Sequence, residues 1–433
     1  MAVFADVVRK NLVIRSAYFF YSRASAFIKS YLLILYGLKC YLSANCRGSQ
    51  NPDILFFASY PNERVAIGHL RRHLRGLSAG DIRLSKANCF RPGALLALPR
   101  FLCAAARWQR FARRLVRRLP FMPACRVFST VAYYARFRRL LARRGAKAVF
   151  IANHYSPECL ALAAVAHRAG LKVLFTNHAN ATWWKAGFVP ALHCDLVAAT
   201  SEAIVDTYAK RGERSFDCVF VPQASPQAPM RCRFEACGQM TVGIFLTALT
   251  SMTRLQALVG RLQADPKVSR ILIRSHPVKV VNEDLSALSA EGEKVMETSA
   301  MALAENIDFC DLAICGNSTV AIELLRGGLP VFYDADLDGL AHDYNGYLER
   351  DLILPLPAAL DGPALQALGR FYDDPRWAAR MRYFDAGYQR DEAAMFRQLN
   401  TAVRRALQVS LPAEAKPYRQ GMPAETPYPA AAS

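Results

Sequence analysis

The sequence predicts an α/β protein with two doubly wound, Rossmann-like domains of parallel strands. Short apolar runs, such as residues 148–153, 172–176 and 312–315, alternate with segments of helical periodicity. Short buried strands that alternate with helices are typical of parallel sheets. The pattern occurs twice, because residues 224–238, which contain two prolines, separate two such series. A chain of 433 residues that is 53% apolar is long enough to form both cores.

Changes in composition along the chain predict the boundaries of six segments. They are a basic and apolar segment at 1–48 that associates with a membrane, an N-terminal domain at 49–223 with an arginine-rich helical insertion at 93–144, a linker at 224–238, a C-terminal domain at 239–375, helices at 376–408 that cross back to the first domain, and a disordered tail at 409–433.

The positive charge of the chain is concentrated in its N-terminal third. The net charge is +20, and residues 82–157 hold fifteen Arg and two Lys with no acidic residue. Apolar residues recur at helical spacing over 101–119, with arginines between them, as in a helix at a membrane interface. We therefore predict that Arg113, Arg114, Arg117 and Arg118 bind an anionic membrane surface. The alternative is a surface helix that docks on its own domain. We expect no nucleic-acid partner, because no nucleic-acid-binding motif accompanies the charge.

The sequence favours a protein of the cytoplasm that is peripheral on the inner face of the plasma membrane. The apolar stretch at 27–42 is interrupted by Lys29 and Lys39 and is shorter than the roughly 20 residues that a spanning helix needs. The N-terminus lacks the pattern of a secretory signal. The twelve cysteines include no Cys-x-x-Cys pair, so most are expected to be buried, reduced thiols.

Two strand ends in the C-terminal half predict a nucleotide pocket. Ser318 and Thr319 follow the strand 312–315 at the point where a helix would begin, and Glu323 lies one turn later, where it could accept hydrogen bonds from a ribose. A second strand ends at Arg274 and His276. Ordinary helix capping remains the alternative for each piece taken alone. The full set of predicted nucleotide-binding residues is Arg274, His276, Pro277, Asn317, Ser318, Thr319, Glu323 and, from a separate loop, Thr247.

The motifs over residues 268–345 resemble the C-terminal half of bacterial capsule-synthesis glycosyltransferases of the GT-B type. The resemblance is carried by Arg274-Ser-His-Pro and by the run Gly-Asn-Ser-Thr-Val-Ala-Ile-Glu that begins at Gly316. The most similar in pattern are the capsule Kdo-transferases and the bacterial sialyltransferases. The resemblance implies a GT-B fold, in which two such domains face a cleft, and contacts from His276, Pro277, Ser318 and Thr319 to the CMP part of a CMP-sugar.

The N-terminal half departs from the pattern of these families. Bacterial sialyltransferases carry an acidic Asp/Glu-Asp/Glu-Gly motif there as the general base, and this chain has none. A looser likeness to teichoic-acid polymerases rests on the same His-Pro pair and on Asn177-His178.

Three residues just past strand ends of the N-terminal half are candidates for the catalytic base: His154, Glu158 and His178. Glu158 could instead favour the start of a helix, and His178 could be a structural histidine. Trp183-Trp184-Lys185 could stack on an acceptor sugar or anchor a loop. We expect the side chains of Asp334, Asp336 and Asp338 to be solvated, with no metal requirement and no cofactor besides the nucleotide-sugar co-substrate.

These observations predict a metal-independent glycosyltransferase. It would transfer a sugar from a nucleotide donor, CMP-activated and of the Kdo or sialic acid type, to a glycan or glycolipid acceptor in a growing bacterial capsule or lipopolysaccharide. One alternative is a CDP-polyol phosphotransferase or a UDP-sugar enzyme of the same fold. Another is a non-catalytic, membrane-associated assembly protein that has kept only the fold.

Overall fold

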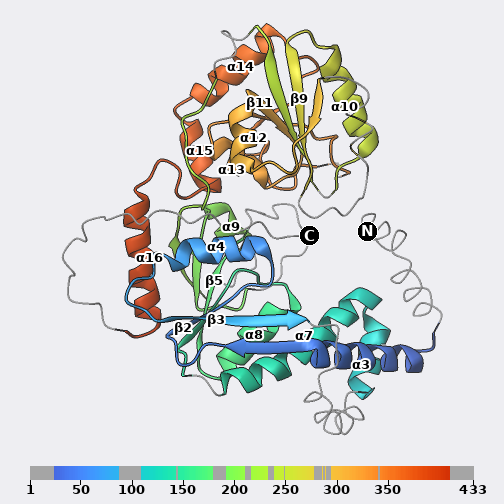
Figure 1. The fold of residues 1–433 in the computed structure, drawn as a ribbon, viewed down its shortest axis with the longest axis vertical. Coiled ribbons are helices and arrows are strands. Elements are labelled where there is room, and N and C mark those ends of the chain that lie inside the picture. Colours follow the sequence, from blue (N-terminus) through green and yellow to red (C-terminus); the bar gives the residue numbers. More distant parts are fainter. Residues whose placement is uncertain are drawn as a thin grey trace.

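The structure is a computed structural model in which two α/β domains lie one above the other along the long axis (Figure 1). The described residues are 24–86, 109–142, 145–178, 192–209, 216–232, 238–247, 249–276, 285, 288, 294–339 and 342–409. Several predictions fall outside these residues. They concern Pro277, the tryptophans at 183 and 184, most of the tail, and the parts of the N-terminal segment and the insertion at 1–23, 93–108, 143 and 144.

The N-terminal domain contains a seven-stranded sheet in the order β1-β3-β2-β4-β5-β6-β7. Its strands are β1 (Ala44–Gly48), β2 (Ile54–Phe57), β3 (Ala79–Lys86), β4 (Ala148–Ile151), β5 (Lys172–Thr176), β6 (Leu196–Ala199) and β7 (Asp217–Phe220). All neighbours pair in parallel except β1 and β3. The central strands are buried along their whole length, as expected for apolar runs covered on both faces.

Helices cover both faces of this sheet. They are α3 (Ala26–Ser43), α4 (Pro61–Arg71), α7 (Phe121–Leu141), α8 (Pro157–Arg168) and α9 (Glu202–Ala209). One core packs beneath α7 and α8, and a second lies beneath α4 on the opposite face. No described helix is both long enough and apolar enough to cross a membrane.

The C-terminal domain contains a six-stranded parallel sheet in the order β10-β9-β8-β11-β12-β13. Its strands are β8 (Met240–Phe245), β9 (Val268–Arg274), β10 (Val295–Glu297), β11 (Leu312–Cys315), β12 (Val331–Tyr333) and β13 (Leu354–Pro355). Its helices are α10 (Met252–Ala264), α12 (Leu303–Phe309), α13 (Val320–Arg326), α14 (Gly362–Asp373) and α15 (Trp377–Phe384). The two parallel-sheet domains confirm the predicted fold class.

The last helix, α16 (Glu392–Ala406), returns from the C-terminal domain to the N-terminal one (Figure 1). Phe396, Leu399 and Val403 join the core beneath α4, together with residues of β2 and β4. Within the stretch 376–408, predicted to hold helices that cross back to the first domain, the structure has α15 and α16, and the chain crosses between the domains in the segment that separates them.

A buried arginine holds this crossing together. The side chain of Arg326, at the end of α13, is completely buried. Its guanidinium donates to Asp385 and to Glu392, each at 2.5 Å, and to the backbone carbonyl of Ser225. Ala228 N–H in turn donates to the Arg326 carbonyl. The linker and the returning chain thus meet at one side chain of the C-terminal domain.

Arg326→Met should destabilise the protein strongly, because it leaves the fully buried Asp385 carboxylate without its cation. We expect a loss of about 3–5 kcal/mol in the free energy of unfolding, measured in urea. The matched control is Arg376→Met, which breaks an ion pair with Asp374 at the surface and should cost far less. Equal effects of the two substitutions would contradict the structural role of Arg326.

Candidate active site

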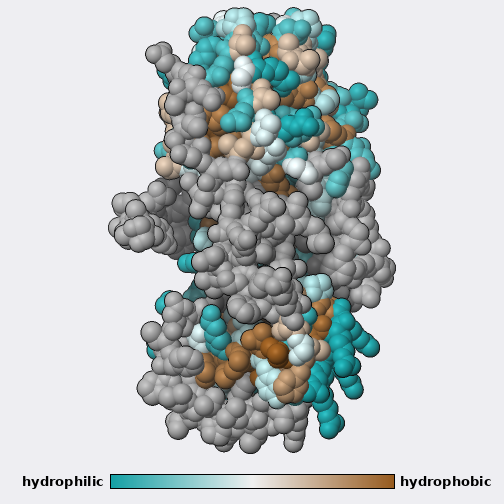
Figure 2. Space-filling view, turned by 90° about the vertical axis from the view of Figure 1, so that its right-hand side faces the viewer, coloured by the Kyte–Doolittle hydropathy of each residue, from teal (hydrophilic) through white to brown (hydrophobic). Residues whose placement is uncertain are grey.

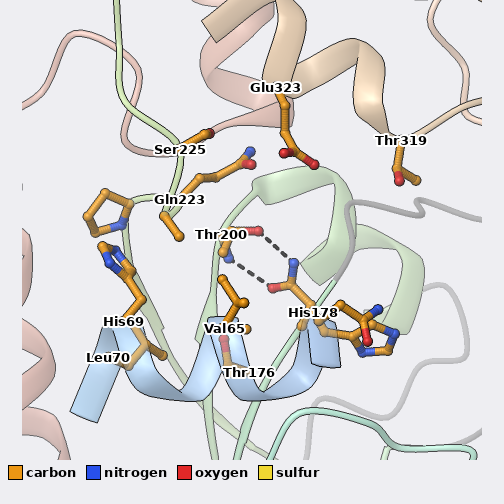
Figure 3. A pocket seen from close by; sticks show the side chains of 15 residues that line it. Val65, His69, Leu70, Thr176, His178, Thr200, Gln223, Ser225, Thr319 and Glu323 are labelled. Atoms are coloured by element: carbon orange, nitrogen blue, oxygen red, sulfur yellow. Dashed lines mark hydrogen bonds between the residues drawn. The ribbon is translucent and has the colours of Figure 1, made fainter. Parts of the chain in front are cut away.

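A cavity lies between the two domains, and both contribute to its wall (Figure 3). In parallel sheets, ligands bind beyond the carboxyl ends of the strands, and the loops at those ends form this cavity. The residues that line it are Asn62, Val65, Ala66, His69 and Leu70 of α4, Thr176, Asn177 and His178 at the end of β5, Thr200 after β6, Pro222 to Ser225 where the linker begins, and Thr319 and Glu323 at the start of α13.

Thr319 and Glu323 face the cavity from the C-terminal domain (Figure 3). Thr319 is the residue that precedes the first turn of α13, and Glu323 lies within that turn. Burial raises the pKa of the Glu323 carboxyl, and the positive charge of Arg274 opposes that rise. The charge of Arg274, at the end of β9, thus acts on Glu323 near the start of α13, and joint binding of one nucleotide by these two strand ends stays a prediction.

None of the other predicted nucleotide-binding residues that the structure describes lines the cavity. The Arg274 guanidinium donates to the carbonyls of Thr298 and Met301, and Ser275 bonds to Ser299, so the end of β9 is tied to the turn after β10. Ser318 is buried, and its carbonyl accepts from the Tyr347 hydroxyl. His276 follows Arg274 at the same sheet edge, and neither it nor Ser318 lines the cavity.

The expectation that Asp338 is solvated is wrong. Its side chain is buried, and its carboxylate accepts hydrogen bonds from the Thr247 hydroxyl and from Asn317 N–H. A Cβ at Gly316 would lie 2.2 Å from a carboxylate oxygen of Asp338, so only glycine fits there. Asp338 thus joins the loop after β8 to the loop after β11, whereas Asp336 is exposed. Thr247, predicted to contact nucleotide, acts in the structure as a donor to Asp338.

His178 faces the cavity from the N-terminal domain with a fixed ring orientation (Figure 3). Its Nδ1 lies 2.5 Å from the carbonyl oxygen of Ala152. A carbonyl can only accept, so Nδ1 carries the proton and, in the neutral ring, Nε2 holds the lone pair. Beside it, Asn177 and Thr200 exchange two hydrogen bonds that join the ends of β5 and β6.

His154 and Glu158 do not line this cavity. Nδ1 of His154 lies 3.0 Å from the Tyr208 hydroxyl, and burial, followed by the charge of His178, lowers the pKa of His154 to about 4. Glu158 lies buried in the first turn of α8, and its charge adds to the burial that raises the pKa of Tyr133 on α7. Of the three predicted catalytic residues, only His178 is placed at the cavity.

A buried carboxylate positions the loop that carries His154. Glu63, completely buried at the start of α4, accepts from the backbone N–H of Ser59 and from the side-chain amide of Asn153. Asn153 then accepts from the backbone N–H groups of Tyr155 and Ser156. Two strand ends of the N-terminal sheet are joined in this way next to His178.

His69 is a cavity residue that sequence reasoning missed. It lies on α4, and its ring packs edge-on against Phe396 of α16 at 5.3 Å. Burial, then the charges of His73 and Arg72, lower its pKa. The sequence offers only a pair of histidines four residues apart, which share one face of a helix. In the described part of the chain, no group of three or more His, Cys, Asp or Glu side chains could hold a metal ion.

Comparison with known proteins finds similar solved structures but no matching family or sequence. No family model and no curated protein sequence matches the chain. MnaA of S. aureus, solved with UDP, is 10% identical over 82% of this chain and 97% of its own, with a TM-score of 0.49. UDP-GlcNAc 2-epimerase of Methanocaldococcus jannaschii is 11% identical over 81% and 99%, with a TM-score of 0.47. MurG of Acinetobacter baumannii is 12% identical over 82% and 100%, with a TM-score of 0.41. At these identities the likeness does not extend to the reaction.

Asp338→Ala should destabilise the loops that carry Thr247 and Asn317. It removes the acceptor of two hydrogen bonds, so we expect a loss of about 1–3 kcal/mol in the free energy of unfolding. Asp336→Ala, at an exposed position in the same loop, is the control and should change it by less than about 0.5 kcal/mol. A destabilisation by Asp338→Ala no larger than that of the control would contradict the bridging role.

The lowered pKa of His154 makes the protein less stable in acid. As the pH falls from 6.5 toward 4, the unfolded chain binds a proton at this ring and the folded chain does not, so stability is lost in that window. Between pH 7 and pH 5, His154→Gln should therefore lose about 1–2 kcal/mol less than the wild type, measured by urea unfolding. The exposed His193→Gln is the control; identical pH profiles for all three proteins would show that His154 titrates normally.

Proposed function

We propose that this protein is a glycosyltransferase that moves a sugar from a nucleotide donor to an acceptor hydroxyl in the cavity between its domains. One observation carries this proposal. A carboxylate and a hydroxyl of the C-terminal domain line the same cavity as an imidazole of the N-terminal domain, whose Nδ1 lies against a backbone carbonyl. Such a division of groups suits a reaction in which one domain holds the donor and the other activates the acceptor.

Glu323 is the proposed ligand of the nucleotide ribose. A carboxylate accepts hydrogen bonds from both ribose hydroxyls, and its position in the first turn of α13 directs it to the cavity. Thr319 lies next to it, and its hydroxyl can donate a hydrogen bond to a phosphate oxygen. Arg274, whose charge acts on Glu323, adds a cation that stabilises the departing phosphate. His276 and Ser318 lie at the same sheet edge outside the cavity lining, and their predicted contact to the nucleotide remains part of the proposal.

His178 is the proposed general base. Because Nδ1–H is held by the Ala152 carbonyl, the lone pair on Nε2 can accept the proton of the acceptor hydroxyl. The acceptor oxygen then forms a bond to the anomeric carbon of the sugar. The bond from that carbon to the phosphate oxygen breaks, and its electron pair leaves with the nucleotide.

The proposal also extends to the identity of the donor nucleotide sugar and of the acceptor. The contacts described here, to ribose and phosphate, serve UDP and CMP donors alike. A UDP-sugar is the first to test, because several solved structures of this architecture are complexes with UDP. The CMP-linked Kdo or sialic acid donor rests on the motif resemblance alone. We further propose a glycan or glycolipid acceptor of a bacterial capsule or lipopolysaccharide, reached at the inner membrane surface through Arg113, Arg114, Arg117 and Arg118.

Thermal shifts with CMP, CDP, UDP, GDP and their sugars test nucleotide binding. We expect one nucleotide to raise the melting temperature of the wild type, because a ligand that binds only the folded state stabilises it. Glu323→Gln should lose most of that shift. A wild-type protein that none of these ligands stabilises would contradict the proposal and favour a non-catalytic assembly protein.

Transfer to acceptor, measured with the nucleotide that binds, tests the base. His178→Ala should keep the nucleotide shift and lower the transfer rate by about 10²–10⁴-fold, since a general base contributes about that much. His193→Ala, which changes an exposed histidine of the same domain, is the control and should retain the wild-type rate. Full transfer by His178→Ala would remove His178 from the mechanism.

A further inference from the structure

One face of α3 exposes a continuous stripe of large apolar side chains. Phe27, Ile28, Tyr31, Leu32, Leu35 and Tyr36 follow one another along that face, and their exposed fractions lie between 38% and 58%. Isolated apolar residues are common on protein surfaces, but a contiguous stripe of six marks an interaction surface. Figure 2 shows hydrophobic residues gathered beside strongly hydrophilic ones at the lower end of the molecule, where Figure 1 places α3.

The opposite face of α3 is firmly attached to the domain. Leu33 and Ile34 are buried against Ala112, Ala124 and Phe128. At Gly37 the helix comes so close to α7 that a Cβ would lie 3.1 Å from the Phe128 ring. The Ser30 hydroxyl also accepts a hydrogen bond from Gln109. The apolar stripe is therefore held in a fixed position on the outside of the domain.

A row of arginines flanks the stripe. The described residues 109–118 are helical, and Arg113, Arg114, Arg117 and Arg118 are exposed on them. The Arg113 guanidinium lies over the Phe27 ring at 4.9 Å from its centroid, so the two helices lie side by side at this end of α3. No Asp or Glu occurs in α3, in 109–118 or in α7. The surface combines apolar side chains with positive charge that has no acidic neighbour on these helices.

We propose that α3 inserts its exposed face into the interface of an anionic lipid bilayer, with the arginines of 109–118 on the lipid phosphates. A helix that lies in the interface buries its apolar side roughly 5–10 Å deep and is retained by basic residues beside it. This inference rests on the proposed place of action at a membrane surface and is independent of the transfer reaction. It assigns the insertion to α3, whereas the arginines alone would provide only electrostatic attraction.

Charge selects the bilayer over other occupants of this surface. A second copy of the chain docked on the same face would bring two rows of arginines together without acidic residues to pair with them. A nucleic acid would pair with the arginines but would leave the six apolar side chains in water. An anionic bilayer satisfies both parts, since it offers phosphates at its surface and acyl chains beneath them.

Flotation of the full-length protein with vesicles tests the inference. We expect binding to phosphatidylcholine vesicles that contain phosphatidylglycerol and at least tenfold weaker binding to phosphatidylcholine alone. The double substitution Leu32→Gln, Leu35→Gln should weaken binding at least tenfold, and so should the substitution of Arg113, Arg114, Arg117 and Arg118 by Gln.

The apolar control is Met296→Gln, Phe309→Gln, at exposed positions of the C-terminal domain. The charge control replaces four exposed arginines elsewhere: Arg261, Arg270, Arg390 and Arg405. Neither control should change binding.

Three results would overturn the inference. They are no flotation with anionic vesicles, unchanged flotation of the Leu32/Leu35 variant, or a solution dimer that this variant dissociates. The nucleotide-induced thermal shift, measured on the same variants, reports the C-terminal domain. A variant that loses vesicle binding but keeps the nucleotide-induced shift is changed only at the docking surface. A wild-type protein without that shift contradicts the proposed transfer reaction and leaves the membrane inference unaffected.

Discussion

The site depends on α13, a helix whose two ends have different partners. Its start places Thr319 and Glu323 at the cavity, and its last residue, Arg326, binds the linker and the returning chain. Arg326 and Asp385 are buried together and tolerate little displacement, because each of these two charges would lose its partner in a medium of low polarity. The same short helix thus positions the proposed nucleotide ligand and fixes the path between the domains.

The N-terminal wall of the cavity is built by a different means. Side chains at the strand ends bond to groups of neighbouring elements: Asn153 with Glu63 of α4, Asn177 with Thr200, and His178 with the backbone at Ala152. These bonds hold the His178 ring before any ligand arrives, which is the preorganisation that proton transfer requires. The N-terminal domain thus has two distinct surfaces. One is the polar cavity at the strand ends, and the other is the apolar and basic face of α3 and residues 109–118.

Local patterns in the sequence were enough to predict most of the strands. The boundaries of β5 and β11 agree to the residue, because each is an apolar run ended by polar residues. The antiparallel pair of β1 and β3 was missed, since Asn45, Arg47 and Asp81 interrupt any apolar run. The burial of Asp338 depends on Thr247 and Asn317, which are distant in sequence, and the place of His69 depends on α16. Such contacts follow from the tertiary fold and leave no local signal.

Hydrogen–deuterium exchange with and without the nucleotide sugar that binds tests most directly whether both domains form one site. We predict slower exchange at residues 318–323 of the C-terminal domain, at 176–178 of the N-terminal domain and at 223–225 where the linker begins, with no change in α10. Slower exchange confined to a single domain, or located away from this cavity, would contradict a site shared between the two domains.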